Sequence, residues 1–413
     1  MFAAKMYLEM KKNILIPLGI MMFMQYLLFA VWWVPFAAYL NNLAQLETHH
    51  VTFILCSMAI GSMASPLVGM IADRYIASEK LLTGLNLLVA FFLFIAIQQT
   101  HFTGIMISIT LVMLCYMPTW SLTSSIAMTH ISSELFPRLR LLGSIGWVAS
   151  GLFSLAGIHV FKMELFDGTV YPLYCGVAAA LATALFNLFL PKTPPTGKSV
   201  AGTSITDIFG LKILFTLKNR NFNRFILISF LAIIPFVLYH AYGSMFFSDI
   251  NVKNITVTMN WGQLAEMFFL FITTGILVRY GFKKTLIFGL LAMLLRYLSF
   301  YLGVVLGQQW LYSIGILTHG LIFGLFFVVG QVYVDKIVPN ELKAQAQGFL
   351  SFVVWGVGYL AGTLLNGWMI GYYKVNNQTD WSLMFLMSSI CSTILIILIL
   401  LFFKNPFSEK RNL

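Results

Sequence analysis

The chain consists of long, almost uninterrupted apolar runs, and this feature limits its fold more than any other. Each run is about twenty residues or longer, which is the length that an α-helix needs to cross the hydrocarbon core of a bilayer. Hydrophobic residues make up 59% of the 413 residues and charged residues only 9%, whereas a soluble domain carries roughly a quarter charged residues. The runs are too long and too uniformly apolar for the strands of a membrane barrel. We therefore predict an all-α integral membrane protein.

Twelve such runs follow one another in two groups of six. The first six lie near residues 13–40, 50–72, 80–99, 102–127, 139–161 and 170–190. The second six lie near residues 223–248, 257–279, 283–304, 308–334, 344–371 and 381–403. The first run has no small-residue cleavage site at signal-peptide distance, so we expect it to stay as a span. We predict an N-terminal half over 1–190, a linker over 191–222 that contains PKTPPTGKS, and a C-terminal half over 223–413.

The basic residues predict the orientation of these spans. The chain has 25 Lys and Arg residues against 14 acidic ones, a net charge of +11. Only Lys162, Lys253 and Lys374 fall on the connections after the fifth, seventh and eleventh spans. Most of the others lie at the termini, in the linker and on the even-numbered connections, which places the termini and the linker in the cytoplasm. This scatter over short loops argues against a nucleic-acid-binding face.

The sequence lacks the motifs of several other functional classes. The four cysteines lie singly inside apolar runs, so we interpret them as apolar packing residues and expect no metal site. No Walker A element is present, which argues against ATP as the energy source. No hydrolase signature is present either. We therefore expect neither an enzyme nor a cofactor.

A short motif recurs half a chain length apart. Residues 69–75 read GMIADRY at the end of the second span, and residues 275–281 read GILVRYG at the end of the eighth. Six spans, a linker and six more spans, with such a repeat, is the architecture of two-half transporters. The G-x-x-x-D-R element resembles the loop motif of the major facilitator superfamily between spans 2 and 3. This resemblance implies that Asp73 and Arg74 form a cytoplasmic latch.

Glu266 is the only acidic residue well inside a predicted span. An ionised carboxylate is costly in hydrocarbon, so this side chain should face the bundle interior and find a partner or take up a proton. Gln263 lies three residues earlier and therefore shares the same helix face. We expect both residues to line a cavity.

Further polar residues mark the fifth, seventh and tenth spans. Arg140, Ser144 and Trp147 follow i, i+4, i+7 spacing and form one stripe, although Arg140 is near enough to the span end to reach the membrane surface instead. His240 and His319 lie mid-span, where an imidazole needs partners that lipid does not supply. Phe323 shares a helix face with His319. Arg296, on the ninth span, is expected to be structural.

Several stretches resemble the nucleoside–proton symporters of the major facilitator superfamily, from bacterial inner membranes. They are Tyr116–Thr119, Phe136–Trp147, Gly262–Glu266, His319–Phe323 and Val334–Gly348. The resemblance implies a nucleoside site between the halves, built from spans 5, 7, 8 and 10. The residues that fall on it are Arg140, Ser144, Trp147, His240, Gln263, Glu266, His319 and Phe323. The sequence departs from the family at His240, where the family has an amide, at Val237, where it has Gln, and at His319. It departs also at Gly324, where the family commonly has a proton-coupling Asp.

The predicted function is uptake of a nucleoside by alternating access, coupled to proton symport across the bacterial inner membrane. Because Gly324 replaces the usual Asp, the candidates for proton coupling are Glu266, Arg140, His240 and His319. We expect a monomer whose partners are the nucleoside, the proton and the lipid bilayer. An importer of a sugar, glycoside or other polar neutral solute stays open as an alternative. Drug efflux and a nucleoside-binding membrane sensor are less favoured.

Overall fold

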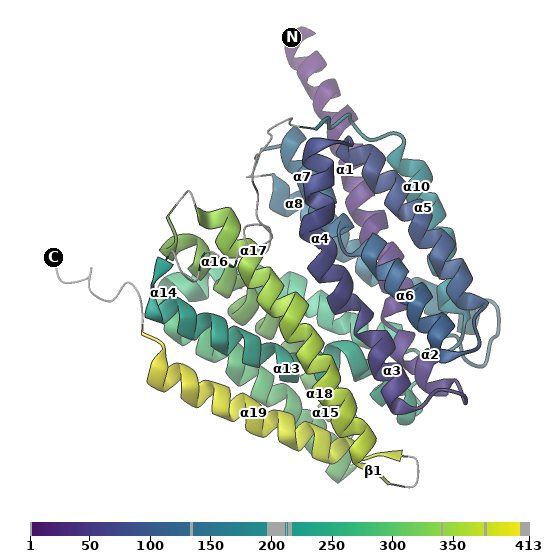
Figure 1. The fold of residues 1–413 in the computed structure, drawn as a ribbon, viewed down its shortest axis with the longest axis vertical. Coiled ribbons are helices and arrows are strands. Elements are labelled where there is room, and N and C mark those ends of the chain that lie inside the picture. Colours follow the sequence, from purple (N-terminus) through teal and green to yellow (C-terminus); the bar gives the residue numbers. More distant parts are fainter. Residues whose placement is uncertain are drawn as a thin grey trace, which may run out of the picture. The chain divides into compact units, whose positions relative to one another are not determined.

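The computed structural model describes residues 2–132, 135–195, 211, 213, 217–339, 342–375 and 378–404. Over these residues the fold is helical, apart from an antiparallel hairpin of β1 (Lys374–Val375) and β2 (Gln378–Thr379) (Figure 1). The prediction of an all-α fold is therefore confirmed. Most of the predicted linker, 191–222, lies outside the described residues.

Ten helical segments of the described part are long and apolar enough to cross a membrane. They are Ile14–Asn42, Thr48–Arg74, Ser78–Ile97, Phe102–His130, Phe136–His159, Arg220–Asp249, Ile255–Leu306, Trp310–Ile337, Gln345–Tyr372 and Trp381–Phe402. A shorter apolar helix, α10, covers Tyr171–Asn187. The 52-residue α14 (Ile255–Leu306) leaves the helical conformation at Gly281, where φ is 74°. Glycine adopts this left-handed region readily, which explains the division of α14.

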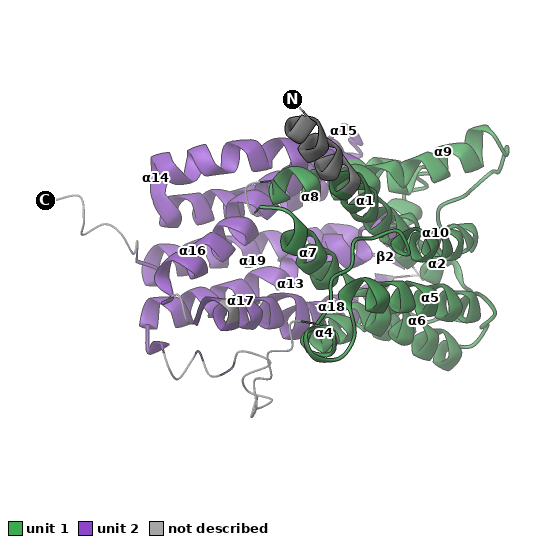
Figure 2. Cartoon of the chain, turned by 90° about the horizontal axis from the view of Figure 1, so that it is seen from above, with its two compact units in different colours: residues 1–201, 247–260 green, residues 202–246, 261–413 purple. Residues whose placement is uncertain are grey.

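The chain forms two compact units, shown in different colours in Figure 2. Unit 1 comprises Met1–Ala201 and Phe247–Asn260, and unit 2 comprises Gly202–Phe246 and Trp261–Leu413. The end of α13 (Arg220–Asp249) and the first turn of α14 therefore belong to unit 1.

Unit 1 contains interrupted helices. Its helices are α1 (Phe2–Trp33), α2 (Phe36–Asn42), α3 (Thr48–Leu55), α4 (Ser57–Arg74), α5 (Ser78–Ile97), α6 (Phe102–Tyr116), α7 (Thr119–His130), α8 (Phe136–Ala149), α9 (Gly151–His159) and α10. Pro35 precedes α2 and Pro118 precedes α7. Both prolines stand at breaks because proline lacks the N–H that continues a helix. Among these helices, α1 packs on α8, and α5 packs on α6 and α10.

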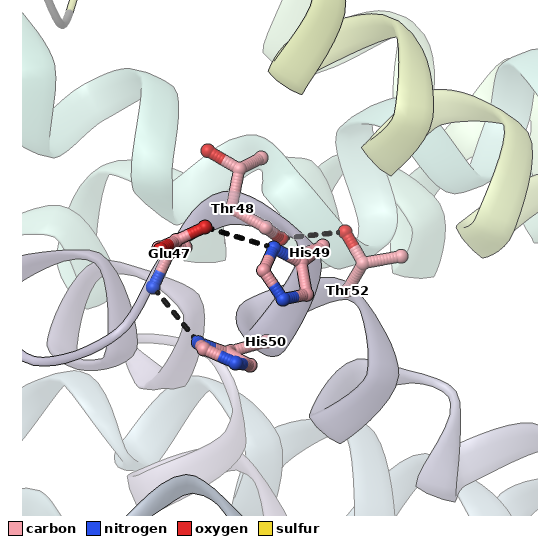
Figure 3. Close-up of polar contacts among 5 residues, drawn as sticks. All are labelled: Glu47, Thr48, His49, His50 and Thr52. Carbon is pink, nitrogen blue, oxygen red and sulfur yellow. Dashed lines mark hydrogen bonds and ion pairs between the residues drawn. The ribbon is translucent and has the colours of Figure 1, made fainter.

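The start of α3 is fixed by local contacts (Figure 3). The backbone N–H of Glu47 donates to Nδ1 of His50 over 3.1 Å, and the Glu47 carboxylate lies 3.2 Å from Nδ1 of His49. Thr52 donates its hydroxyl to the carbonyl of Thr48. These contacts stay within one turn, and the Glu47 and His49 side chains are exposed. We therefore interpret these polar residues as the N-terminal cap of α3.

The described part of unit 2 contains two π-helical segments. Its elements are most of α13 and α14, then α15 (Trp310–Ile322), η1 (Phe323–Val328), α16 (Val329–Ile337), α17 (Lys343–Ser351), η3 (Phe352–Gly358), α18 (Tyr359–Tyr372) and α19 (Trp381–Phe402). The π-helical segments are η1 and η3. Such segments are rare and are often found at functional sites. Both lie beside the predicted site residues, as described next.

Candidate functional site

Glu266 of α14 and His319 of α15 form a buried pair in unit 2. The Glu266 residue is 8% exposed, and its Oε2 lies 3.6 Å from Nε2 of His319. The two helices approach closely here because Gly320 has no side chain. A Cβ on Gly320 would lie 2.5 Å from the backbone of Ala265 and of Glu266. The pair brings a carboxylate and an imidazole together where little solvent reaches them. Two titratable groups in such a position are suited to take up and release a proton.

The second histidine lies beside this pair. Nδ1 of His240, on α13, is 2.9 Å from the hydroxyl of Tyr359 on α18. The Phe236 ring, one turn earlier on α13, stacks on His240 at 5.5 Å and on His319 at 5.8 Å between centroids. Phe236 therefore links the two imidazoles.

Aromatic side chains surround both histidines. Phe323, the first residue of η1, stacks on His319 with centroids 6.3 Å apart. Trp355 of η3 lies 6.2 Å from the His240 ring and 5.8 Å from the Phe327 ring. Phe327 and Trp355 also line a cleft together with Ser229 and Gln331. This aromatic lining offers flat apolar surfaces to a ring-shaped ligand.

Four of the five residues predicted for unit 2 thus gather in one cluster: His240, Glu266, His319 and Phe323. Gln263 is half-buried, one turn before Glu266 on α14. Three further residues of this cluster were not predicted from the sequence: Phe236, Trp355 and Tyr359. Phe236 lies four residues before His240, so helical spacing from a predicted site residue was a signal for Phe236. No such signal existed for Trp355 and Tyr359, because their span contains no predicted site residue.

Arg296 is buried in the core of unit 2, with an exposed fraction of 0%. Its Nε donates to the carbonyl of Gly315 over 3.1 Å, and its guanidinium carbon lies 4.4 Å from the centre of the Tyr239 ring. Its two terminal nitrogens have no hydrogen-bond partner among the described residues. The Tyr239 ring is in turn 6.1 Å from the His319 ring. Arg296 is therefore one side chain away from the pair of Glu266 and His319.

The predicted stripe of α8 lies in unit 1 against aromatic residues of α1. The Arg140 guanidinium carbon is 4.7 Å from the centre of the Tyr26 ring. Trp147 is half-buried, 5.8 Å from the Phe29 ring. Ser144 lies between Arg140 and Trp147 on the same helix and is also half-buried. The stripe thus presents a cation, a hydroxyl and an indole in sequence.

A buried polar network supports this region. Gln25 of α1 donates to Asn86 of α5 over 3.2 Å and to Thr119 of α7 over 2.8 Å, and Asn86 donates back over 2.9 Å. All three residues have an exposed fraction of 0%. A buried network whose members all have partners fixes the register of the helices that carry it. Asn86 and Thr119 therefore hold the segment of α1 that presents Tyr26 and Phe29.

The described residues contain no group of three His, Cys, Asp or Glu side chains close enough to hold a metal ion. Two of the cysteines, Cys56 and Cys115, are buried, and Cys175 and Cys391 are half-buried. The two clusters present amide, carboxylate, imidazole, guanidinium and aromatic groups. Such groups recognise polar, ring-containing small molecules.

Comparison with known proteins identifies the family. The family described as nucleoside H+ symporter matches residues 12–408. The chain belongs to the nucleoside H+ symporter family. The resemblance inferred from the sequence motifs is thereby confirmed, and the chain is a multi-pass membrane protein of a transporter family.

Relatives and solved structures agree with this assignment. YegT of Escherichia coli strain K12 is 32% identical over 404 residues, which cover 95% of this chain and 94% of the relative. The nucleoside permease NupG of the same strain is 26% identical, over 95% of this chain and 96% of its own. A crystal structure of NupG matches 94% of this chain and 99% of its own with a TM-score of 0.82 at 25% identity. A D-xylose–proton symporter shares the fold at 12% identity, with a TM-score of 0.71.

Proposed function

We propose that this chain moves a nucleoside together with a proton by alternating access. The observation that supports the proposal best is the buried pair of Glu266 and His319 within an aromatic cluster. A nucleoside is neutral, flat at its base and rich in hydroxyls at its sugar. Aromatic rings such as Phe323 stack on a base, and a carboxylate accepts hydrogen bonds from vicinal hydroxyls. A site with these groups disfavours ligands that leave its buried polar atoms unpaired.

The predicted residues of both units take part in this proposal. In unit 2, His240, Gln263, Glu266, His319 and Phe323 bind the nucleoside. In unit 1, Arg140, Ser144 and Trp147 do so. The two clusters belong to different units, so relative movement of the units changes their access to the ligand.

The proton is carried by the pair of Glu266 and His319. Gly324 leaves the family's usual acidic position without a carboxylate. Glu266 is the only buried carboxylate among the described residues of unit 2. Oε2 of Glu266 and Nε2 of His319 are 3.6 Å apart, which is an ion-pair distance, so the protonation of either group affects the other. His240 and Arg140 are the remaining coupling candidates, and His240 already contacts Tyr359.

The proposal includes a membrane arrangement. Gly281 divides α14 into two spans, and α10 adds another to the long segments, which together with the remaining segments gives twelve. The positive charge of the loops supports cytoplasmic termini, and we propose that the chain lies in the inner membrane of a bacterium. We take one chain as the working unit.

Uptake into proteoliposomes tests the function. Labelled uridine or adenosine should accumulate when an inward proton gradient is imposed and should only equilibrate without it. Glu266→Gln should abolish gradient-driven accumulation because it removes the titrating carboxylate but keeps a hydrogen-bonding group. Nucleoside exchange without a gradient should persist. Gradient-driven accumulation by Glu266→Gln at the wild-type level would contradict the coupling role.

A matched control is available in unit 1. Glu79 is also 8% exposed, but its carboxylate accepts from the backbone N–H of Thr193, in the segment that follows α10. Glu79→Gln should therefore retain gradient-driven uptake in protein that reconstitutes normally. Competition with unlabelled ligands tests the substrate class: nucleosides should displace labelled uridine, whereas displacement by sugars alone would support the sugar alternative.

A further inference from the structure

Tyr26 of α1 makes contacts that none of the predicted roles explains. Its ring lies under the guanidinium of Arg140, with 4.7 Å from the guanidinium carbon to the ring centre. The residue is only 7% exposed, whereas Arg140 is exposed. A cation over an aromatic face is attracted by the ring quadrupole, and the attraction increases where water is excluded. The buried ring thus supports an accessible cation.

The Tyr26 ring is fixed from α8. Gly143 of α8 leaves the space that the ring occupies, because a Cβ on Gly143 would lie 2.8 Å from Cδ2 of Tyr26. Gly143 is also three residues after Arg140, so both lie on the same face of α8. The glycine therefore allows the ring to approach the helix that carries the arginine.

The ring is fixed from α7 as well. Trp120 lies parallel to Tyr26, with an angle of 5° between the rings and 6.0 Å between their centroids. The indole N–H of Trp120 donates to the hydroxyl of Tyr116, which donates to the carbonyl of Gln25. The position of the ring is thus set by α6, α7 and α8 together.

The Tyr26 hydroxyl takes no part in this arrangement. It is buried and has no hydrogen-bond partner among the described residues. The ring face, and not the hydroxyl, is therefore the part of Tyr26 that meets Arg140. The ring and the hydroxyl of Tyr26 can therefore be tested by separate substitutions.

We propose that Tyr26 is a positioning residue that holds the Arg140 guanidinium in place for the nucleoside. The proposal rests on the proposed function, since Arg140 is one of the residues assigned there to the ligand. An arginine side chain has many rotamers, and restricting them before binding lowers the entropy cost of the bound state. The guanidinium is planar and delocalised and stacks on aromatic faces, so the Tyr26 ring can fix the plane in which its donors lie.

The test is the equilibrium affinity of purified, full-length protein for labelled uridine. Tyr26→Phe should bind as the wild type does, because it keeps the ring. Tyr26→Leu should weaken binding by roughly tenfold, because it removes the π-face. Arg140→Gln should weaken binding too. The double variant of Tyr26→Leu and Arg140→Gln should bind as Arg140→Gln alone, because Tyr26 acts through the arginine.

Ring-fluorinated phenylalanines at position 26 provide a second test that does not depend on the folding of Tyr26→Leu. Each added fluorine weakens the negative face of the ring with little change in its shape. The dissociation constant for uridine should rise with the number of fluorines, and it should stay flat in the Arg140→Gln background. A flat series in the wild-type background, or additive effects in the double variant, overturns the positioning role.

The outcomes separate this proposal from the proposed function. If the wild type binds uridine but the dissociation constant does not change along the fluorinated series, the nucleoside function stands and the role of Tyr26 is rejected. Wild-type protein that binds no nucleoside rejects both. Thermal unfolding of each variant in detergent confirms that affinities are compared among folded proteins.

Discussion

A single buried cation, Arg296, gives the sharpest prediction at the scale of one residue. Its Nε donates to the carbonyl of Gly315 and its guanidinium lies over the Tyr239 ring, but its two terminal nitrogens are buried and have no geometric hydrogen-bond partner among the described residues. Replacing a poorly paired buried charge by an apolar side chain is often neutral or stabilising. Arg296→Met should therefore unfold at the same temperature as the wild type or at a higher one. Its free energy of unfolding should rise by up to about 2 kcal/mol.

The same variant should transport the nucleoside more slowly than the wild type. Tyr239 connects Arg296 with His319, so removing the cation changes the charge around the coupling pair. We expect slower gradient-driven uptake and an altered dependence of uptake on pH, measured in proteoliposomes beside thermal unfolding in detergent. A variant that is destabilised and still transports normally would show that Arg296 serves the fold and not the coupling.

The sequence predicted some of these residues better than others. Glu266 and His319 stood out because polar groups are rare inside apolar spans. Phe236, Tyr239 and Trp355 did not, because an aromatic residue in an apolar run looks the same whether it faces a ligand, a neighbouring helix or lipid. Only the rotation of each helix decides among these, and that rotation depends on packing between helices.

At the scale of elements, the first turn of α14 is held by a residue from another segment. Asp167, in the connection between α9 and α10, is 1% exposed. It accepts from the backbone N–H and the hydroxyl of Thr256 over 2.8 and 2.9 Å, and from the hydroxyl of Ser154 over 2.8 Å. Thr256 is the second residue of α14, where the backbone N–H has no partner within the helix. Asp167 therefore acts as a cap that is distant in sequence.

Removing this cap should destabilise the protein. Asp167→Ala leaves three buried donors without their acceptor, so the free energy of unfolding should fall by about 2 kcal/mol or more. The free energy of unfolding of Asp167→Asn should fall by less, because the amide oxygen of asparagine still accepts a hydrogen bond. Thermal unfolding of both variants in detergent measures the difference. An alanine variant as stable as the wild type would mean that α14 starts independently of this contact.

The stability of Asp167→Asn relative to the wild type should also depend on pH. Burial raises the pKa of Asp167 above its ordinary value of 3.8, although the hydrogen bonds from Thr256 and Ser154 oppose the shift. The folded protein then holds the proton more tightly than the unfolded chain does. This contribution to stability is complete below pH 3.8 and is lost as the pH rises through the folded pKa. Asparagine does not titrate, so the advantage of the wild type should shrink as the pH is raised from about 4.

At the scale of the whole molecule, the architecture was easier to predict than the grouping of its parts. The repeated apolar runs predicted a membrane fold because the bilayer sets the length of each helix. Residues 247–260 nevertheless group with unit 1. This grouping depends on contacts such as those of Asp167 with Thr256 and of Asn260 with the carbonyl of Val148. Apolar runs and loop charges contain no information about such contacts between distant segments.

The complete transport cycle should move net charge, because a neutral nucleoside travels with one proton. One elementary charge crossing 100 mV is worth about 2.3 kcal/mol, which corresponds to accumulation of roughly 50-fold. In proteoliposomes at equal pH on both sides, an inside-negative potassium diffusion potential should therefore drive uridine accumulation. Glu266→Gln, which leaves His319 without the carboxylate, should equilibrate uridine but not accumulate it. If uridine uptake by the wild type does not change with the membrane potential, the cycle carries no net charge. The pair of Glu266 and His319 would then act in binding alone.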